Sequence, residues 1–533
     1  MPPEHVLHRR RTSGLTQNTC PPCRIHCGQG GIFLPQVKPI FYRALLLTGV
    51  NLLLRVVGTS FQVYLSRHIG AAGIGLLQLV LSLGNLAMVA GIAGIRTATM
   101  YLTAEELGKG KPQNVGRILS ACFLYGILSS GAVAAALFFS APLLARRWIG
   151  NSLTVPALRL FAVFLPAVCL SGVMSGYFTA ANRIGTLAAV EVAEQLCSMA
   201  VTLTTLTLWA GKDVERACLC VVLGGGVSAW VTLALLVWLR LREGSELGAP
   251  IPVRRRLLHA ALPLAGADVV RSGISTTENL LVPKRLSLFP GEADPMSAFG
   301  RISGMVFPVM MFPACILFAL AELLIPELAR CNAAGKRSRI QYLVQKGLWS
   351  SMLYGMFFGG LIFLYARPLC LRLYQNEEAG RSLQFYAVMV PFLYCDAITD
   401  AMTKGLGQQR VCVRYNIITS FLDVAFLFLL LPVYGMKGYF FSFLVTHLLN
   451  FLLSMRRLCR ITGYRIPFAT PALAASAGLL AIRLSTLLRL RLSYIPIFLL
   501  LLNLFGVLGK QELLWMRQLL SLTGRKRQVK AAG

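Results

Sequence analysis

Apolar stretches long enough to cross a lipid bilayer recur along almost the whole sequence. A membrane-spanning helix needs roughly 20 consecutive apolar residues. Hydrophobic residues make up 56% of the 533 residues and charged residues only 14%, whereas charged residues make up about a quarter of a soluble globular protein. The sequence therefore predicts an all-α polytopic membrane protein with about fourteen spans. We expect them near 44–66, 74–95, 118–139, 157–178, 186–210, 215–239, 257–282, 302–325, 347–366, 383–402, 412–432, 438–456, 468–487 and 494–509.

The Lys and Arg residues are distributed unevenly between the two sides of the predicted membrane. The formal net charge is +31, but the N-terminal segment, the even-numbered connections and the C-terminal tail carry more than twice as many Lys and Arg as the odd-numbered connections. Cytoplasmic loops carry such an excess, so both termini are expected in the cytoplasm. The basic clusters at 254–256 and 525–530 predict contacts with anionic membrane lipids, and nucleic acid is not an expected partner. The arginines that fall within predicted spans include Arg55, Arg159, Arg271 and Arg483.

The spans fall into two similar halves. Arg55, Gly75 and Arg183 in the first half recur as Arg271, Gly300 and Arg410 in the second, with an insertion at 289–297. The identities are sparse, so spacing alone leaves coincidence open. We expect a disordered cytoplasmic leader (1–40), an N-terminal lobe of six helices (41–240), a basic linker (241–256), a C-terminal lobe of six helices (257–460), two extra helices (461–510) and a basic cytoplasmic tail (511–533).

The leader contains the stretch CPPCRIHC at 20–27, which resembles half of a zinc site. No second pair of ligands follows at zinc-finger spacing. An unstructured leader is therefore the favoured interpretation, and no metal or cofactor is expected. The sequence also has no phosphate-binding loop, no H-E-x-x-H motif and no soluble domain able to house an active site. It does not predict an enzyme.

Four stretches resemble a known family: RVVGTSFQVYLSRHIGAAGIGLLQL (55–79), GIAGIRTATMYLTAEELGKGK (91–111), ALPLAGADVVRSGISTTENLLVPKRL (261–286) and FGRISGMVFPVMMFPACILFALAELLIPELA (299–329). They are similar to the stage V sporulation protein B group of the multidrug/oligosaccharidyl-lipid/polysaccharide (MOP) exporter superfamily, near the lipid II flippase MurJ. Glu278 stands where the family usually has an aspartate, which keeps the acidic character on a longer side chain.

The resemblance implies two six-helix lobes around a central cavity, alternating access, and transfer of an undecaprenyl-pyrophosphate-linked glycan across the bacterial plasma membrane. Spans thirteen and fourteen would line a groove for the lipid tail. A cation-coupled multidrug exporter of the same superfamily is the alternative. A polytopic glycan-transferring enzyme is a third interpretation, but its outward loop at 283–301 offers little beyond Glu292 and Asp294.

Arg55 is the leading candidate for binding the substrate. It lies about eleven residues from either end of its span, roughly 16 Å at 1.5 Å per residue. A charge this deep usually faces a wet cavity or a partner. Arg271 occupies the matching place in the other half, and two guanidinium forks suit a pyrophosphate. An internal ion pair of Arg271 with Asp268 is the structural alternative. Arg96, Asp268 and Glu278 complete the predicted binding residues.

Other polar residues within the spans have less certain roles. Glu191 and Glu194 lie three residues apart in span five and either balance arginines of the lobe or carry protons for coupling. His447 is favoured as a hydrogen-bonded packing residue over a proton relay. Asp423 is embedded in its span, and the sequence does not indicate its partner.

Overall fold

The computed structural model describes residues 37–92, 94–211, 213–242, 253–464, 469–488 and 490–507. Regular structure in these ranges is entirely helical. Contacts divide the chain into Met1–Tyr42 and Arg43–Gly533, and every contact described for this protein lies within the second unit. The predicted CPPCRIHC site, most of the leader and linker, and the basic tail lie outside the described residues.

The described residues of the first half of the chain form six α-helices. Short π-helical turns, Ala145–Ile149 (η2) and Leu206–Ala210 (η4), extend α3 and α5. The six are α1 (Val37–Ile92), α2 (Ile95–Gly108), α3 (Val115–Leu144), α4 (Val155–Ala180), α5 (Ile184–Thr205) and α6 (Val214–Leu241).

The remainder of the described chain forms eleven helices, several of them short. They are α7 (Val253–Leu286), α8 (Pro295–Gly300), α9 (Phe307–Met311), α10 (Ala314–Ala333), α11 (Arg337–Tyr374), α12 (Glu377–Tyr386), α13 (Val390–Gly405), α14 (Gln409–Tyr434), α15 (Met436–Thr462), α16 (Ala469–Leu487) and α17 (Tyr494–Leu504).

The prediction of an all-α polytopic membrane protein is confirmed, but the count of fourteen spans is not. The described residues contain ten helices long and apolar enough to cross a membrane, or eleven if the bent pair Pro295–Met311 and Ala314–Ala333 is one span. Three predicted spans account for the difference. The first two predicted spans run together with α2 in one segment, Leu52–Gly108. The seventh corresponds to α7, which is not among the apolar spans. The last corresponds to α17, which is short.

Gly70 marks the boundary between the first two predicted spans. It lies inside α1 with φ 72° and ψ −179°, and the helix kinks there. This backbone region is costly for residues with a side chain and accessible to glycine. A second break follows at Gly94, which adopts a left-handed conformation before α2 begins. The predicted second span therefore ends at a break, with Arg96 on the first turn of the next helix.

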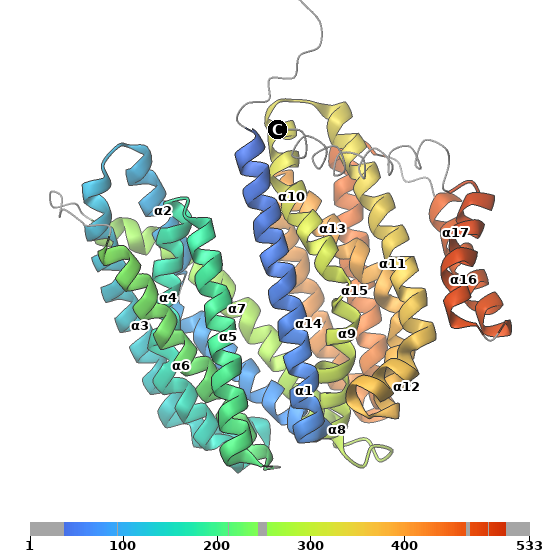
Figure 1. The fold of residues 1–533 in the computed structure, drawn as a ribbon, viewed down its shortest axis with the longest axis horizontal. Helices are drawn as coiled ribbons and strands as arrows, with labels where there is room; N and C mark the ends of the chain where they lie inside the picture. The colour runs from blue at the N-terminus through green and yellow to red at the C-terminus, as the bar shows by residue number, and fades with distance from the viewer. Residues whose placement is uncertain are drawn as a thin grey trace, which may run out of the picture. The chain divides into compact units, whose positions relative to one another are not determined.

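α7 packs against helices of both halves of the chain. In the first half α4 packs against α2, α3 and α6, whereas in the second α13 packs against α10, α11 and α15; Figure 1 shows these as a blue-to-green group and a yellow-to-orange group. Near its start, Leu257 and Ala261 of α7 are buried in the core of the first group. Near its end, Leu280 and Leu286 are buried in a core that includes the second group, and α7 packs against α14.

Candidate functional site

Arg55 lies on α1 and contacts α10. Its guanidinium carbon is 5.7 Å from the centroid of the Phe318 ring, and its side chain lies near the Cys315 thiol. The residue is exposed. Within the described part of the chain no carboxylate pairs with it, so its charge is available for an anionic ligand.

Arg271 lies on α7 and is also exposed, as is Asp268 one turn earlier. No ion pair joins these two side chains in the described structure, so the internal pair considered from the sequence is not formed here. No recorded contact joins Arg271 to Arg55 either. Their shared role in binding therefore remains a proposal.

Arg96 is exposed on the first turn of α2. Its backbone packs tightly on α4, because a Cβ placed on Gly176 would lie 2.5 Å from the Arg96 carbonyl oxygen. The backbone at Arg96 is thereby fixed while its side chain stays exposed.

Glu278 belongs to a polar cluster between α7, α14 and α15. Its carboxyl lies near Ser420 and close enough to Asp423 for electrostatic repulsion. Asp423 in turn accepts hydrogen bonds from the hydroxyls of Ser442, at 2.5 Å, and Thr446, at 3.4 Å. The structure thus supplies the partners that the sequence did not indicate for Asp423.

His447 extends this polar region toward α13. Its Nδ1 is 3.8 Å from Oδ2 of Asp396, and its ring packs against Phe443 with centroids 4.2 Å apart. Asn450 donates to both oxygens of Asp396, at 3.0 and 3.2 Å. His447 thus lies beside a carboxylate and an aromatic ring, and the choice between a hydrogen-bonded packing residue and a proton relay stays a prediction.

Glu191 and Glu194 are half-buried on α5. Glu194 lies near Thr232 on α6 and near Glu191. No recorded ion pair in the described structure links either carboxylate to an arginine of the same half. The role of the two residues in coupling therefore stays a prediction.

An ion-pair cluster joins the end of α2 to the start of α7. Arg256 pairs with Glu105 at 2.8 Å and with Glu106 at 3.0 Å. Glu106 is only 3% exposed and also accepts a hydrogen bond from Asn114 at 2.8 Å. Hydrogen bonds to Glu105 and Glu106 raise the pKa of Arg256. No local pattern in the sequence indicates this cluster, because its members are separated by about 150 positions.

Glu292 and Asp294, which a glycan-transferring enzyme would need, have structural roles. Glu292 pairs with Arg301 at 3.3 Å, and the Asp294 carboxylate caps α8 by accepting from the Ser297 backbone N–H. The described residues also contain no group of three or more His, Cys, Asp or Glu side chains that could hold a metal ion.

A large groove lies where α11, α13 and α15 face α16. Its volume is about 1140 Å³, slightly above the usual upper limit of about 1,000 Å³ for ligand pockets. Most of its lining is apolar, including Trp349, Met352 and Phe363 of α11. Arg483 and Thr486 near the end of α16 add polar groups.

Two family models and two curated proteins match parts of this sequence. Residues 43–271 match the family model described as polysaccharide biosynthesis protein, and residues 287–429 match the MatE model. The chain is 22% identical over 416 residues to stage V sporulation protein B of Bacillus subtilis (strain 168), covering 74% of this chain and 78% of that protein. It is also 22% identical over 275 residues to sporulation protein YkvU of the same organism, covering 50% of this chain and 61% of YkvU.

Solved structures show the same fold. The lipid II flippase MurJ in an inward closed conformation has a TM-score of 0.67 at 12% identity, covering 88% of this chain and 100% of that chain. An inward-facing multidrug resistance MATE family transporter of the MOP superfamily has a TM-score of 0.62 at 12% identity, covering 79% and 100%. The chain is thus similar in sequence to stage V sporulation protein B, and it shares its fold with MurJ and with a MATE family transporter.

Proposed function

We propose that the protein flips a polyprenyl-pyrophosphate-linked glycan precursor across the bacterial plasma membrane by alternating access. A peptidoglycan intermediate is the most plausible cargo. Arg55 and Arg271 would capture the pyrophosphate, the sugar would enter the wet interior, and the polyprenyl tail would stay in contact with lipid. Arg96, Asp268 and Glu278 would complete the polar lining.

The two membrane arginines carry this proposal. Each lies on a helix that the sequence places deep in the bilayer, where a charge costs at least about 2.5–3.5 kcal/mol on insertion scales. Each is exposed, and neither has a carboxylate partner in the described structure. A guanidinium fork can hold two anionic oxygens at once, so an anionic substrate would supply the missing partner.

The groove beside α16 favours a substrate that has a long lipid tail. It is mostly apolar and lies on the helices of the second half, away from the charged residues of α1 and α7. A polyprenyl chain has no polar groups to satisfy, so it can lie against such an apolar surface at the lipid boundary. A substrate that is a compact drug cation does not explain why this long apolar surface is present.

Contacts near the predicted outward ends supply a gate for alternating access. Arg67 of α1 donates to the carbonyls of Arg372 and Leu373 at the end of α11. Asn279 of α7 donates to the Ser82 hydroxyl of α1 at 2.9 Å. We infer that these polar contacts close the outward side in this conformation and break when the cavity opens outward.

Binding of a polyprenyl-pyrophosphate glycan to the purified protein tests the proposal. Arg55→Ala and Arg271→Ala should each weaken binding by a factor of roughly 30 or more, since losing a desolvated charge-assisted contact typically costs about 2–5 kcal/mol. Arg414→Ala is the matched control, because Arg414 is also exposed and also lies over an aromatic ring, at 6.0 Å from Tyr415. Wild-type affinity in well-folded Arg55→Ala protein would end the pyrophosphate proposal.

A cation-coupled drug exporter is the alternative that the polar cluster of the second half favours. Glu278, Asp423 and Asp396 provide carboxylates that a cationic substrate or coupling ion would use. This alternative expects binding of lipophilic cations that depends on those carboxylates and not on Arg55. Measuring cation binding and pyrophosphate-lipid binding on the same variants separates the two functions.

A further inference from the structure

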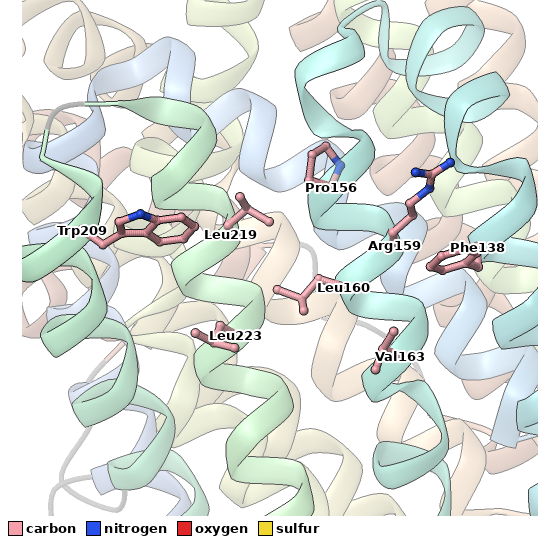
Figure 2. A pocket seen from close by; sticks show the side chains of 8 residues that line it. All are labelled: Phe138, Pro156, Arg159, Leu160, Val163, Trp209, Leu219 and Leu223. Atoms are coloured by element: carbon pink, nitrogen blue, oxygen red, sulfur yellow. The ribbon is translucent and has the colours of Figure 1, made fainter.

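A second, shallower groove crosses the exposed face of α4 in the first half, far in the sequence from the groove beside α16. Its volume is about 420 Å³, within the range of about 300–1,000 Å³ typical of ligand pockets. Figure 2 shows Phe138 of α3 on one side and Trp209 of η4 on the other, with α4 side chains between them. Neither the proposed pyrophosphate site nor the tail groove includes these residues.

The groove is apolar except for one cation. Arg159 is the only charged residue in its lining. The guanidinium lies over the Phe138 ring, 5.2 Å from its centroid, and the described structure gives it no carboxylate partner. Leu160, Leu219 and Leu223 form an apolar floor. The groove thus combines one uncompensated positive charge with a surface suited to a hydrocarbon chain.

The position of these groups matches the boundary between headgroups and acyl chains. Arg159 is in the second turn of α4, about 6 Å from the helix start at 1.5 Å per residue. Trp209 lies at the end of α5, where a π-helical turn precedes Gly211, and its side chain is 53% exposed. Aromatic side chains are enriched at this membrane level, and a basic side chain here lies within reach of lipid phosphates.

We propose that this groove binds an acidic phospholipid of the adjacent leaflet. Its phosphate pairs with Arg159, and one acyl chain lies on α4 between Trp209 and Val163. Charge complementarity selects the occupant: an acidic phospholipid carries the anion that Arg159 lacks and the apolar chain that the leucines would cover. A zwitterionic lipid offers the same chain but no net charge, so Arg159 would set the preference.

Trp209 provides a direct readout in the full-length protein reconstituted into phosphatidylcholine vesicles. Brominated acyl chains quench tryptophan fluorescence on contact, and the difference between wild type and Trp209→Phe isolates the Trp209 signal from the other five tryptophans. Brominated phosphatidylglycerol should quench this signal at about fivefold lower mole fraction than brominated phosphatidylcholine, the factor expected for one interfacial arginine.

Three variants test the two parts of the proposal, the pairing of the phosphate with Arg159 and the contact of the acyl chain with the groove. Arg159→Gln should abolish the preference for phosphatidylglycerol, whereas Arg159→Lys should keep most of it. Val163→Phe, which fills the groove without changing charge, should reduce quenching by both lipids, and it keeps the test decisive if Arg159→Gln folds poorly. Arg491→Gln is the control, because Arg491 is exposed in the connection between α16 and α17 and does not line this groove.

Several results would overturn the proposal. Equal quenching of the wild type by the two lipids would mean that Arg159 selects no headgroup. If the preference for phosphatidylglycerol persists in Arg159→Gln, or is lost equally in Arg491→Gln, general surface charge and not Arg159 causes that preference. Loss of quenching on adding a polyprenyl pyrophosphate, without any preference for phosphatidylglycerol, would assign the groove to the transported lipid.

Discussion

Gly75 and Gly300 lie backbone against backbone where α1 meets the end of α8. A Cβ on Gly75 would lie 2.5 Å from the Met296 carbonyl oxygen, and one on Gly300 would approach the Ala71 carbonyl oxygen even more closely. Small residues let membrane helices approach in this way. The two glycines that marked the internal repeat therefore form one contact between the two halves.

Gly300→Ala should destabilise this contact. Inserting a methyl group into a well-packed site typically costs about 1–3 kcal/mol, so the melting temperature of the purified protein should fall. Gly131→Ala is the matched control, since nothing lies within 4 Å of a Cβ at Gly131, which is inside α3. Equal melting temperatures for Gly300→Ala and Gly131→Ala would show that the contact does not hold the conformation described here.

The helical architecture could be predicted because each span needs only a local apolar stretch. The sequence also predicted an interruption between the first two spans, at 67–73, but not the single helix kinked at Gly70 that runs through it. The count of fourteen spans is not confirmed where a helix departs from uniform hydropathy. α7 carries Asp268, Arg271 and Glu278, and these charged residues lower its mean hydropathy.

The partners within the site could not be predicted, because they come from helices distant in the sequence. Asp423 meets Ser442 and Thr446 only because α14 packs against α15. Arg55 meets Phe318 across more than 250 positions. A single sequence gives the residue types that suit an anion or a buried carboxylate, but not which helix faces bring them together.

The membrane topology gives a second prediction. In a cysteine-free background, Leu288→Cys should be labelled only from outside the cell and Lys336→Cys only from the cytoplasm. Both native residues are exposed in connections between helices, so a probe can reach them. Labelling of position 288 from the cytoplasmic side alone would reverse the predicted orientation of both termini.

The hydroxyl donors around Asp423 give a third prediction. Ser442→Ala removes the 2.5 Å donor and leaves a half-buried carboxylate poorly satisfied, which typically costs about 1–3 kcal/mol. Ser454→Ala is a control on the same helix, because the buried Ser454 hydroxyl has no hydrogen-bond partner in the described structure. The melting temperature should fall more in Ser442→Ala than in Ser454→Ala. An equal decrease would show that the hydrogen bond from Ser442 to Asp423 does not stabilise the fold.

The Arg256 cluster gives a fourth prediction. Arg256→Ala would leave the buried Glu106 with weaker compensation and should lower the melting temperature clearly. Lys109→Ala should have a smaller effect, because the Lys109 side chain is 49% exposed and its nitrogen lies 3.6 Å from Glu106. Adding Glu106→Gln to Arg256→Ala should recover part of the loss. If the double variant is no more stable than Arg256→Ala, the cluster contributes little through charge compensation.

Arg55→Lys separates the charge of the arginine from its geometry. Lysine keeps the positive charge but presents a compact ammonium in place of a planar fork, so it cannot hold two phosphate oxygens in the same way. Binding of a polyprenyl-pyrophosphate glycan should therefore be weaker in Arg55→Lys than in the wild type, and weaker still in Arg55→Ala. Both proteins should insert normally, since neither change adds a charge to the span.

An internal counter-ion role for Arg55 predicts the opposite pattern. Arg55→Lys would then bind like the wild type, and Arg55→Ala would express poorly because a carboxylate had lost its partner. The structure opposes that role: Phe318 and Cys315 are the recorded contacts of Arg55, and no carboxylate pairs with it among the described residues. Binding isotherms for the three proteins, with expression level and melting temperature as controls, distinguish a pyrophosphate fork from a structural charge.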